Sequence, residues 1–223
     1  MNFNNLETQL IDEYEVEREV IRFLEWTDTC FSRFKNKCSK EDFQRSRILK
    51  KVREEVWPLR VFLKNNLDVF HTVQLFGESQ PYDAIGKKHS HLSYIEITCV
   101  KDGQFDLFQA QHMDLFGHAP ASGIRKEDFL QANISGEASV GDCTYPRDEV
   151  RKAFEGVKVR LLDKNNKKYE PETILIVGVD SSSFSEIKYW NEFCELLSHF
   201  KDPLQFSNIF CVCTYTDRFF KIR

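Results

Sequence analysis

Apolar residues recur at helical spacing near the start of the chain and at strand spacing in its middle. Residues 8–25 begin with acids, and their apolar positions lie three and four apart, which predicts one amphipathic helix. A second helix is predicted to begin near Ser39, where a serine precedes two acids, and to be limited by Pro58 because proline lacks a backbone donor, with room for a further turn or two in "LRVFLKNN". The first third of the chain is therefore predicted to be mostly helical.

Short β-branched and aromatic segments follow, and turn-forming residues separate them. The segments "HTVQLFG", "PYDAIGKK" and "SYIEITCV" predict a meander of two or three strands. A short helix is predicted over residues 106–116. Residues 117–146 are rich in Gly, Ala, Ser and Pro and predict an irregular insertion, which at this length is usually functional or mobile.

The last third alternates between helices and strands. Residues 146–169 predict a long helix, and the apolar run "TILIVGVD" predicts a strand covered on both faces. The amphipathic helix "FSEIKYWNEFCELLSHF" and the strand "NIFCVCTYT" complete the pattern. Because a long helix between two strands indicates a parallel crossover, the expected fold class is α/β (or α+β), with a central mixed sheet flanked by helices. Residues 1–44 are expected to be a helical extension packed on a core of residues 45–223.

Composition places the chain among ordinary globular proteins. Of its 223 residues, 41% are hydrophobic and 30% are charged, and the net charge of −4 disfavours a broad nucleic-acid-binding surface while leaving a local basic cleft open. The seven cysteines are dispersed without CxxC pairs, which favours free thiols in a reducing cytoplasm. The first residues show neither the basic nor the apolar region of a signal peptide, and no apolar run is long enough to span a bilayer. A cytoplasmic protein without membrane contact is expected.

Two carboxylates stand out in the predicted meander. Alternation along "YIEITCV" places Tyr94, Glu96 and Thr98 on one face of their strand, and Asp83 reaches the same face if the two strands pair as a hairpin. Two buried carboxylates on one face repel each other, and a divalent cation removes that repulsion. Mg²⁺, or Mn²⁺ in its place, accepts a small number of carboxylates and polarises its waters. The alternative is structural: Asp83 caps a turn and Glu96 faces solvent.

The stretch "QPYDA…YIEIT" resembles the PD-(D/E)xK, or restriction-endonuclease-like, nuclease superfamily. The resemblance covers roughly residues 45–180 in the order of elements but only a handful of motif residues. It implies a core of helix, three-stranded meander, helix and strand, with Asp83 and Glu96 as metal ligands and Mg²⁺ as the cofactor. Thr98 stands where the family has its lysine. The resemblance therefore implies that another residue has taken over the lysine's role, and Lys101 and Gln111 are equally ranked candidates.

Further residues are candidates for supporting roles. Glu78 is the preferred third metal ligand, whereas Glu54 and Glu55 on the preceding helix fit a solvated helix face better. Basic residues that could contact phosphate lie at the hairpin, on the preceding helix and near "KNNKKY", and solvated helix faces explain several of them equally well. They are Lys87, Lys88, Arg47, Lys51, Lys164, Lys167 and Lys168.

Other chemistries have weaker support. The chain contains no GxxxxGK[ST], GxGxxG or GxSxG motif, and His89 and His91 lack further zinc ligands at a suitable spacing. The leading hypothesis is a metal-dependent nuclease that hydrolyses phosphodiester bonds, with DNA as the first choice of substrate. The alternative is a non-catalytic nuclease-like accessory protein, of the kind found in multi-component bacterial or phage systems, which binds a protein partner through its N-terminal helix.

Overall fold

The computed structural model describes residues 3–37, 46–77, 80–100 and 146–223. Within these ranges seven strands form one sheet, in the order in which they occur along the chain. They are β1 (Arg18–Glu19), β2 (Thr72–Leu75), β3 (Ala84–Lys88), β4 (His91–Val100), β5 (Ile174–Val179), β6 (Asn208–Cys213) and β7 (Arg218–Lys221). Strands β4, β5 and β6 run parallel, and all other neighbours are antiparallel. The predicted α/β class with a mixed sheet flanked by helices is confirmed.

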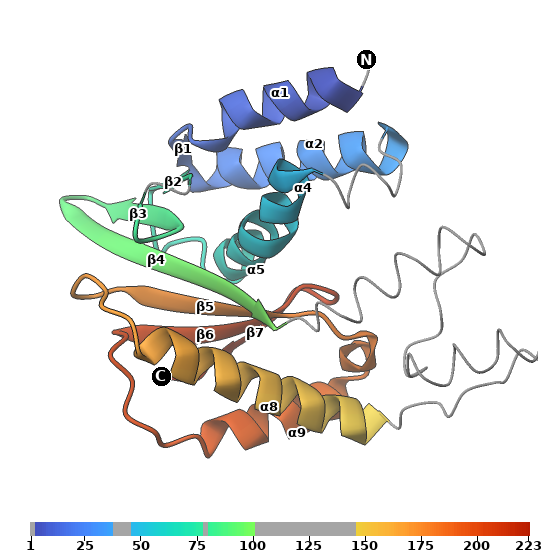
Figure 1. Cartoon of the computed structure of the whole chain (residues 1–223), viewed down its shortest axis with the longest axis vertical. Coiled ribbons are helices and arrows are strands. Elements are labelled where there is room, and N and C mark those ends of the chain that lie inside the picture. The colour runs from blue at the N-terminus through green and yellow to red at the C-terminus, as the bar shows by residue number, and fades with distance from the viewer. Residues whose placement is uncertain (1–2, 38–45, 78–79, 101–145) are drawn as a thin grey trace, which may run out of the picture.

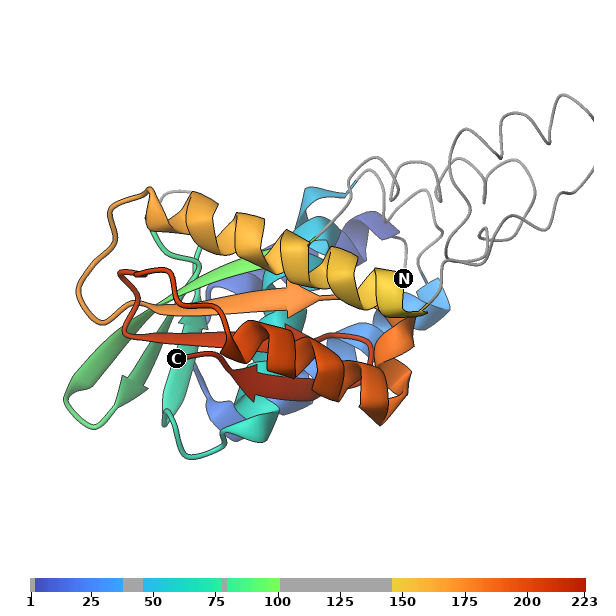
Figure 2. The same cartoon turned by 90° about the horizontal axis from the view of Figure 1, so that it is seen from below.

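Helices cover both faces of this sheet (Figures 1 and 2). One layer contains α1 (Phe3–Tyr14), α2 (Val20–Lys37), α4 (Arg47–Lys51), the π-helical turn η1 (Val52–Val56) and α5 (Trp57–Asn65). The other contains α8 (Pro146–Asn165), the 3-10 turn η2 (Ser182–Ser185) and α9 (Ile187–Ser198). Each layer has its own apolar core, and the two cores meet the sheet from opposite sides.

Strand β5 is the centre of the sheet, and all six of its residues are buried. Ile174 and Ile176 belong to the core beneath α5, whereas Leu175 and Val177 belong to the core beneath α8 and α9. Gly178 allows α5 to approach closely, because a Cβ atom there would lie 2.8 Å from the Cys99 sulfur and 3.0 Å from Pro58. The continuous apolar run thus dictates a three-layer architecture.

The helix that leads into the meander continues past Pro58 to Asn65, within the further turns that the sequence allows. Proline has no N–H, so the carbonyl of Glu54, four residues earlier, loses its helical donor. The Cys99 thiol on β4 donates to that carbonyl at 3.4 Å instead. The π-helical turn η1 directly precedes α5 and carries the chain into the proline with helical geometry.

The prediction of one helix over residues 8–25 is wrong. Helix α1 ends at Tyr14, and β1 then pairs with β2 before α2 begins. Arg18 stabilises this break because its guanidinium donates to the carbonyls of Glu13, at 2.5 Å, and Val16, at 2.8 Å. Backbone pairing with a distant strand therefore outweighs the local helical pattern.

The other predicted helices and strands within the described residues are present, with small shifts of their ends. A further strand, β7, was not predicted. Strand β7 pairs antiparallel with β6 after a turn in which Asp217 adopts a φ of 55°. The predicted helix over residues 106–116 and nearly all of the insertion near 117–146 lie outside the described residues. So does Ser39, the predicted start of the second helix.

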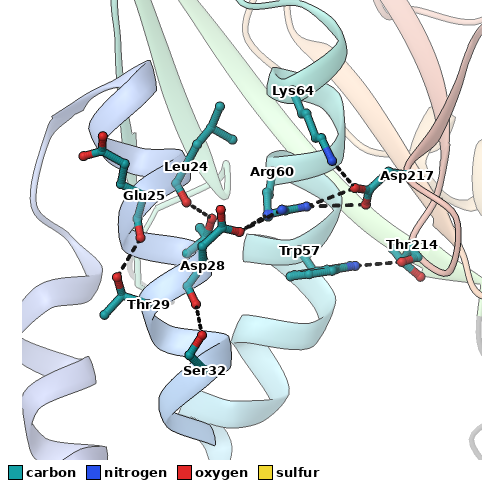
Figure 3. Close-up of polar contacts among 11 residues, drawn as sticks. Leu24, Glu25, Asp28, Thr29, Ser32, Trp57, Arg60, Lys64, Thr214 and Asp217 are labelled. Atoms are coloured by element: carbon teal, nitrogen blue, oxygen red, sulfur yellow. Dashed lines mark hydrogen bonds and ion pairs between the residues drawn. The ribbon is translucent and has the colours of Figure 1, made fainter. Parts of the chain in front are cut away.

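An ion-pair cluster joins the N-terminal helices to the C-terminal hairpin (Figure 3). The Arg60 side chain on α5, which is 12% exposed, contacts Asp28 of α2 at 2.7 Å and Asp217 of the β6–β7 turn at 3.4 Å. Lys64 contacts the same Asp217 at 2.6 Å, and the Trp57 indole N–H donates to the Thr214 carbonyl at 2.8 Å. The cluster connects segments that lie more than 150 positions apart in the chain.

Replacing Arg60 with alanine is expected to lower the free energy of unfolding by roughly 2 kcal/mol, because it removes a half-buried charge partner from two carboxylates. Urea denaturation measures the change. Arg22→Ala is the matched control, since Arg22 and its partner Glu19 are 76% and 69% exposed and their pair is expected to contribute less than about 0.5 kcal/mol. Equal losses in the two variants would contradict this role for Arg60.

Candidate acid-pair site

Asp83 lies at the point where β3 separates from β4. The last β3–β4 pair joins Ala84 to Ile95, whereas β4 continues beside β5 as far as Val100. Asp83 donates its backbone N–H to the Ile95 carbonyl at 3.0 Å. Its carboxylate oxygen Oδ2 accepts the backbone N–H of Ile97 at 2.7 Å. The carboxylate therefore occupies the edge of β4 that β3 leaves unpaired.

Glu96 lies on the α8 side of β4 and is buried, with 6% of the residue exposed. Its neighbours Ile95 and Ile97 belong to the core on the other side of the sheet, as strand alternation predicts. Lys164, in the last turn of α8, forms an ion pair with Glu96 Oε1. The Tyr169 hydroxyl, in the loop between α8 and β5, donates to the same oxygen at 3.3 Å.

A third acid, Glu55 of η1, belongs to the same electrostatic cluster. The Tyr14 hydroxyl of α1 donates to Glu55 Oε2, and the Lys51 ammonium lies 3.9 Å from that oxygen. The charge of Glu55 acts on Asp83, and the charge of Glu96 acts on Glu55. The helix that precedes the meander thus brings one carboxylate into the neighbourhood of the acid pair.

Burial is the largest cause of the raised pKa of both Asp83 and Glu55. It raises the pKa of Asp83 to about 7, and repulsion from Glu96 and then Glu55 acts in the same direction. The Ile97 N–H and the Lys164 charge oppose the rise but do not cancel it. Burial also raises the pKa of Glu55, against the opposing effects of Tyr14 and Lys51. The site therefore holds more negative charge than its own lysines neutralise.

The two tyrosines at the site are neutral hydrogen-bond donors. Burial, followed by the charge of Glu96, raises the pKa of Tyr169 above its ordinary value. Burial and the charge of Glu55 raise the pKa of Tyr14 in the same way. Each hydroxyl is held by a carboxylate from a different acid of the cluster, so both rings have fixed positions.

The donor set of the acid pair fits a hard divalent cation. Mg²⁺ binds through one or two carboxylates and completes its octahedron with waters and substrate oxygens. Burial first, and then repulsion from Glu96 and Glu55, raises the pKa of Asp83, and a cation bound between the carboxylates would offset that repulsion. Among the described residues, no three His, Cys, Asp or Glu side chains group closely enough to hold a metal by themselves. Asp83 and Glu96 would therefore supply the protein side chains of such a site, and water the remaining ligands.

The other predicted site residues are distributed unevenly. Thr98 is half-buried on β4, two positions after Glu96. Lys51 lies beside Glu55, whereas Arg47 is exposed at the start of α4. Lys87 contacts Glu17 at 2.6 Å and Lys88 donates to the Asp68 carbonyl at 2.6 Å, both at the end of β3 away from Asp83. Lys101, Gln111 and Glu78 lie outside the described residues.

Sequence reasoning grouped Lys164 with general phosphate contacts and missed its pairing with Glu96, and it did not single out Tyr169. The order of the elements contained a signal from which the pairing of Lys164 with Glu96 could have been predicted. The helix of a parallel crossover returns antiparallel to its strands, so its last turn lies over the start of the next strand. Ile174 begins β5 and pairs with Ile95, which places the end of α8 beside Glu96.

The chain has no significant match to a protein-family model, a curated protein or a solved structure. Of the helices that the structure describes, none is both long and apolar enough to cross a membrane. The geometry of the acid pair therefore carries the functional proposal.

Replacing Asp83 with asparagine is expected to flatten the pH dependence of stability in the absence of metal. In the unfolded chain Asp83 titrates near its ordinary pKa of 3.8, and in the fold near 7. Between these values the unfolded state has lost a proton that the folded state keeps, so wild-type stability falls as the pH rises from about 4 to about 7. Asparagine removes that fall and still accepts the Ile97 N–H, so the variant is expected to be more stable at pH 8 by roughly 2–4 kcal/mol.

Urea denaturation at pH 4, 6 and 8 with a metal chelator present measures this difference. Asp68→Asn is the control, because Asp68 is exposed and far from the acid cluster in the fold. Parallel pH profiles for wild type and Asp83→Asn would show that Asp83 ionises freely in the folded protein.

Proposed function

We propose that the chain is a metal-dependent phosphodiester hydrolase of the PD-(D/E)xK type, with Asp83 and Glu96 as the metal ligands and Mg²⁺ as the ion. The observation that carries the proposal is the convergence of Asp83, Glu96 and Lys164 where β3 separates from β4. The order of elements also supports it, because a helix, the β2–β4 meander, the crossover helix α8 and β5 follow one another as in that superfamily.

Lys164 takes the place of the lysine that the motif lacks at Thr98. Its side chain is 17% exposed and its ammonium pairs with the carboxylate of Glu96, so it lies within the acid cluster although it comes from a different element. A lysine on α8 reaches Glu96 from the helix layer that covers this face of the sheet, whereas one at position 98 would reach along the strand. The lysine therefore comes from another element, but its ammonium pairs with the carboxylate of Glu96.

Each of the chain's own residues at the site would have a separate role in hydrolysis. A bound Mg²⁺ supplies a polarised water and neutralises charge on the phosphate oxygens. Asp83 is held by the Ile97 N–H, and Glu96 is held by Lys164 and Tyr169, so both carboxylates are oriented before substrate arrives. Lys164 provides positive charge where negative charge grows on the phosphoryl group during in-line displacement. Glu55 and Tyr14 remain behind the pair as a buried support.

A second candidate, a nuclease-like interaction protein without catalysis, has one observation in its favour. Both carboxylates of the pair already have protein partners, since Asp83 accepts the Ile97 N–H and Glu96 accepts from Lys164 and Tyr169. Such satisfied acids can be retained for structure alone. Metal binding and cleavage separate the two candidates.

Wild-type protein is expected to bind Mg²⁺ and Mn²⁺ in calorimetry and to cleave plasmid or single-stranded DNA, or RNA, in their presence. Asp83→Ala and Glu96→Ala are expected to lose both metal binding and cleavage, because each removes a ligand. Asp68→Ala is the control for an exposed aspartate. A wild type that binds neither ion would overturn the hydrolase and favour the interaction protein.

Lys164→Ala is expected to separate binding from chemistry. Metal affinity should stay the same or increase, because Glu96 loses a competing cation, while the cleavage rate falls about 100-fold through loss of charge stabilisation. Lys164→Arg should recover part of that rate. Lys158→Ala, on the same helix and paired only with the exposed Glu155 among the described residues, should cleave like wild type. Unchanged cleavage by Lys164→Ala would exclude it as the substitute lysine.

A further inference from the structure

A small cavity opens beside the acid pair, between the segment that leads into β3 and the loop that joins α8 to β5. Its volume is about 130 Å³. The residues that line it are Pro81, Tyr82, Lys168, Tyr169, Glu170 and Thr173. Tyr82 directly precedes Asp83 in the chain, and the Tyr169 hydroxyl donates to Glu96 at 3.3 Å. The cavity and the acid pair are thus two parts of one surface, joined through both tyrosines.

The aromatic walls of the cavity are fixed by their neighbours. The Tyr82 ring packs edge-on against Phe76, with centroids 5.3 Å apart, and against Tyr94 at 4.9 Å. The Tyr169 ring packs against Phe206 at 5.0 Å. These contacts orient both rings before any ligand binds, which reduces the entropy cost of stacking a ligand on them.

The loop that carries Lys168 and Glu170 is also anchored. The Gln205 side chain donates to the Asn165 carbonyl at 3.1 Å and to the Lys167 carbonyl at 2.5 Å. The Thr173 hydroxyl donates to the Glu170 carbonyl at 2.6 Å. These hydrogen bonds hold both ends of the loop, so the wall that it contributes to the cavity has a fixed position.

The chemistry of this lining suits an aromatic ligand that also carries a phosphate. Tyrosine rings supply stacking surfaces, and Lys168 is exposed and forms no ion pair with any carboxylate in the described part of the chain. The exposed Glu170 carboxylate at the rim is an acceptor for an N–H group of a base, which in thymine and uracil is the ring N3–H. Stacking, a phosphate contact and an acceptor are the three contacts by which proteins bind unstacked bases.

The size of the cavity selects one ring. An engineered cavity of roughly 150 Å³ in another protein holds a single benzene molecule. A volume of about 130 Å³ therefore accommodates one six-membered ring, and a fused two-ring base would extend beyond it.

We propose that this cavity binds an unpaired pyrimidine base of the nucleic-acid strand whose backbone lies at the acid pair. The inference rests on the proposed function in that the neighbouring acid pair makes a nucleotide the expected occupant. It specifies the substrate as a single strand, or as a duplex with a frayed or displaced base, because a base in an intact duplex is not free to enter. DNA and RNA share this chemistry, and the experiment below distinguishes them.

The test measures binding of fluorescein-labelled oligothymidylate, oligouridylate and oligoadenylate of equal length, and of a blunt duplex, by fluorescence anisotropy. Ca²⁺ replaces Mg²⁺ to limit cleavage during the measurement. Wild type is expected to bind one of the pyrimidine strands more tightly than the adenylate strand. Oligodeoxyuridylate, which differs from oligouridylate only in the sugar, is measured beside it and shows whether DNA or RNA binds more tightly. Equal or tighter binding of oligoadenylate would overturn the choice of a pyrimidine.

Tyr82→Ala is expected to weaken single-strand binding at least about fivefold, because it removes a stacking face, and to leave duplex binding unchanged. Tyr82→Phe keeps the ring and should bind within twofold of wild type. Tyr82→Leu fills the space beside Phe76 and Tyr94 without an aromatic face, so it repeats the test if the alanine variant unfolds. Tyr215→Ala, which alters a 59%-exposed tyrosine in the β6–β7 turn, is the matched control. A folded Tyr82→Ala or Tyr82→Leu with wild-type affinity would overturn the proposal.

Lys168→Ala tests the phosphate contact independently. The slope of log affinity against log salt concentration should become shallower by about 0.7, the value for one phosphate contact on a single strand. An unchanged slope would remove Lys168 from the site.

Failure of the cavity proposal and failure of the proposed function give different results. Binding through Tyr82 without cleavage would overturn the hydrolase alone, and cleavage that ignores Tyr82 and Lys168 would overturn the cavity alone.

Discussion

The burial of β5 on both faces is the constraint from which the rest of the architecture follows. A strand whose six residues are all apolar or glycine is stable only between two covering layers, so α5 packs above it and α8 and α9 pack below it. The parallel pairs β4–β5 and β5–β6 need crossover helices, and α8 and α9, both in the lower layer, are those helices. Gly178 sets how closely the upper layer approaches, since any side chain there would meet Cys99 and Pro58.

The candidate site is a consequence of this arrangement. Strand β4 is longer than β3, so its second half has β5 on one side and no β3 partner on the other. Asp83 satisfies the Ile97 N–H at this unpaired edge, which brings its carboxylate next to Glu96. The crossover helix α8 then delivers Lys164 to the same place. The acid pair, its lysine and its tyrosine come from three separate segments that only the layered fold brings together.

Charge at this site is balanced incompletely within the protein. Asp83, Glu96 and Glu55 interact with one another, and Lys164 and Lys51 offset part of their repulsion. Perturbed acids gather at functional sites, although structural ion-pair networks also perturb them, and this imbalance is the reason for proposing a cation here. The adjoining aromatic cavity adds a contact surface for a ligand that the acids alone could not orient.

The sequence by itself determined the fold class, the central strand, the meander, the two crossover helices and the side of β4 from which Glu96 projects. These depend on local periodicity, which every window of the chain carries. Only the tertiary structure decided the break between α1 and α2 at Arg18, the strand β7, the hydrogen bond from Cys99 to the Glu54 carbonyl ahead of Pro58 and the partnership of Lys164 with Glu96. Each of these depends on a contact between residues far apart in the chain, and a local pattern holds no information about which distant group will supply the missing hydrogen bond or charge.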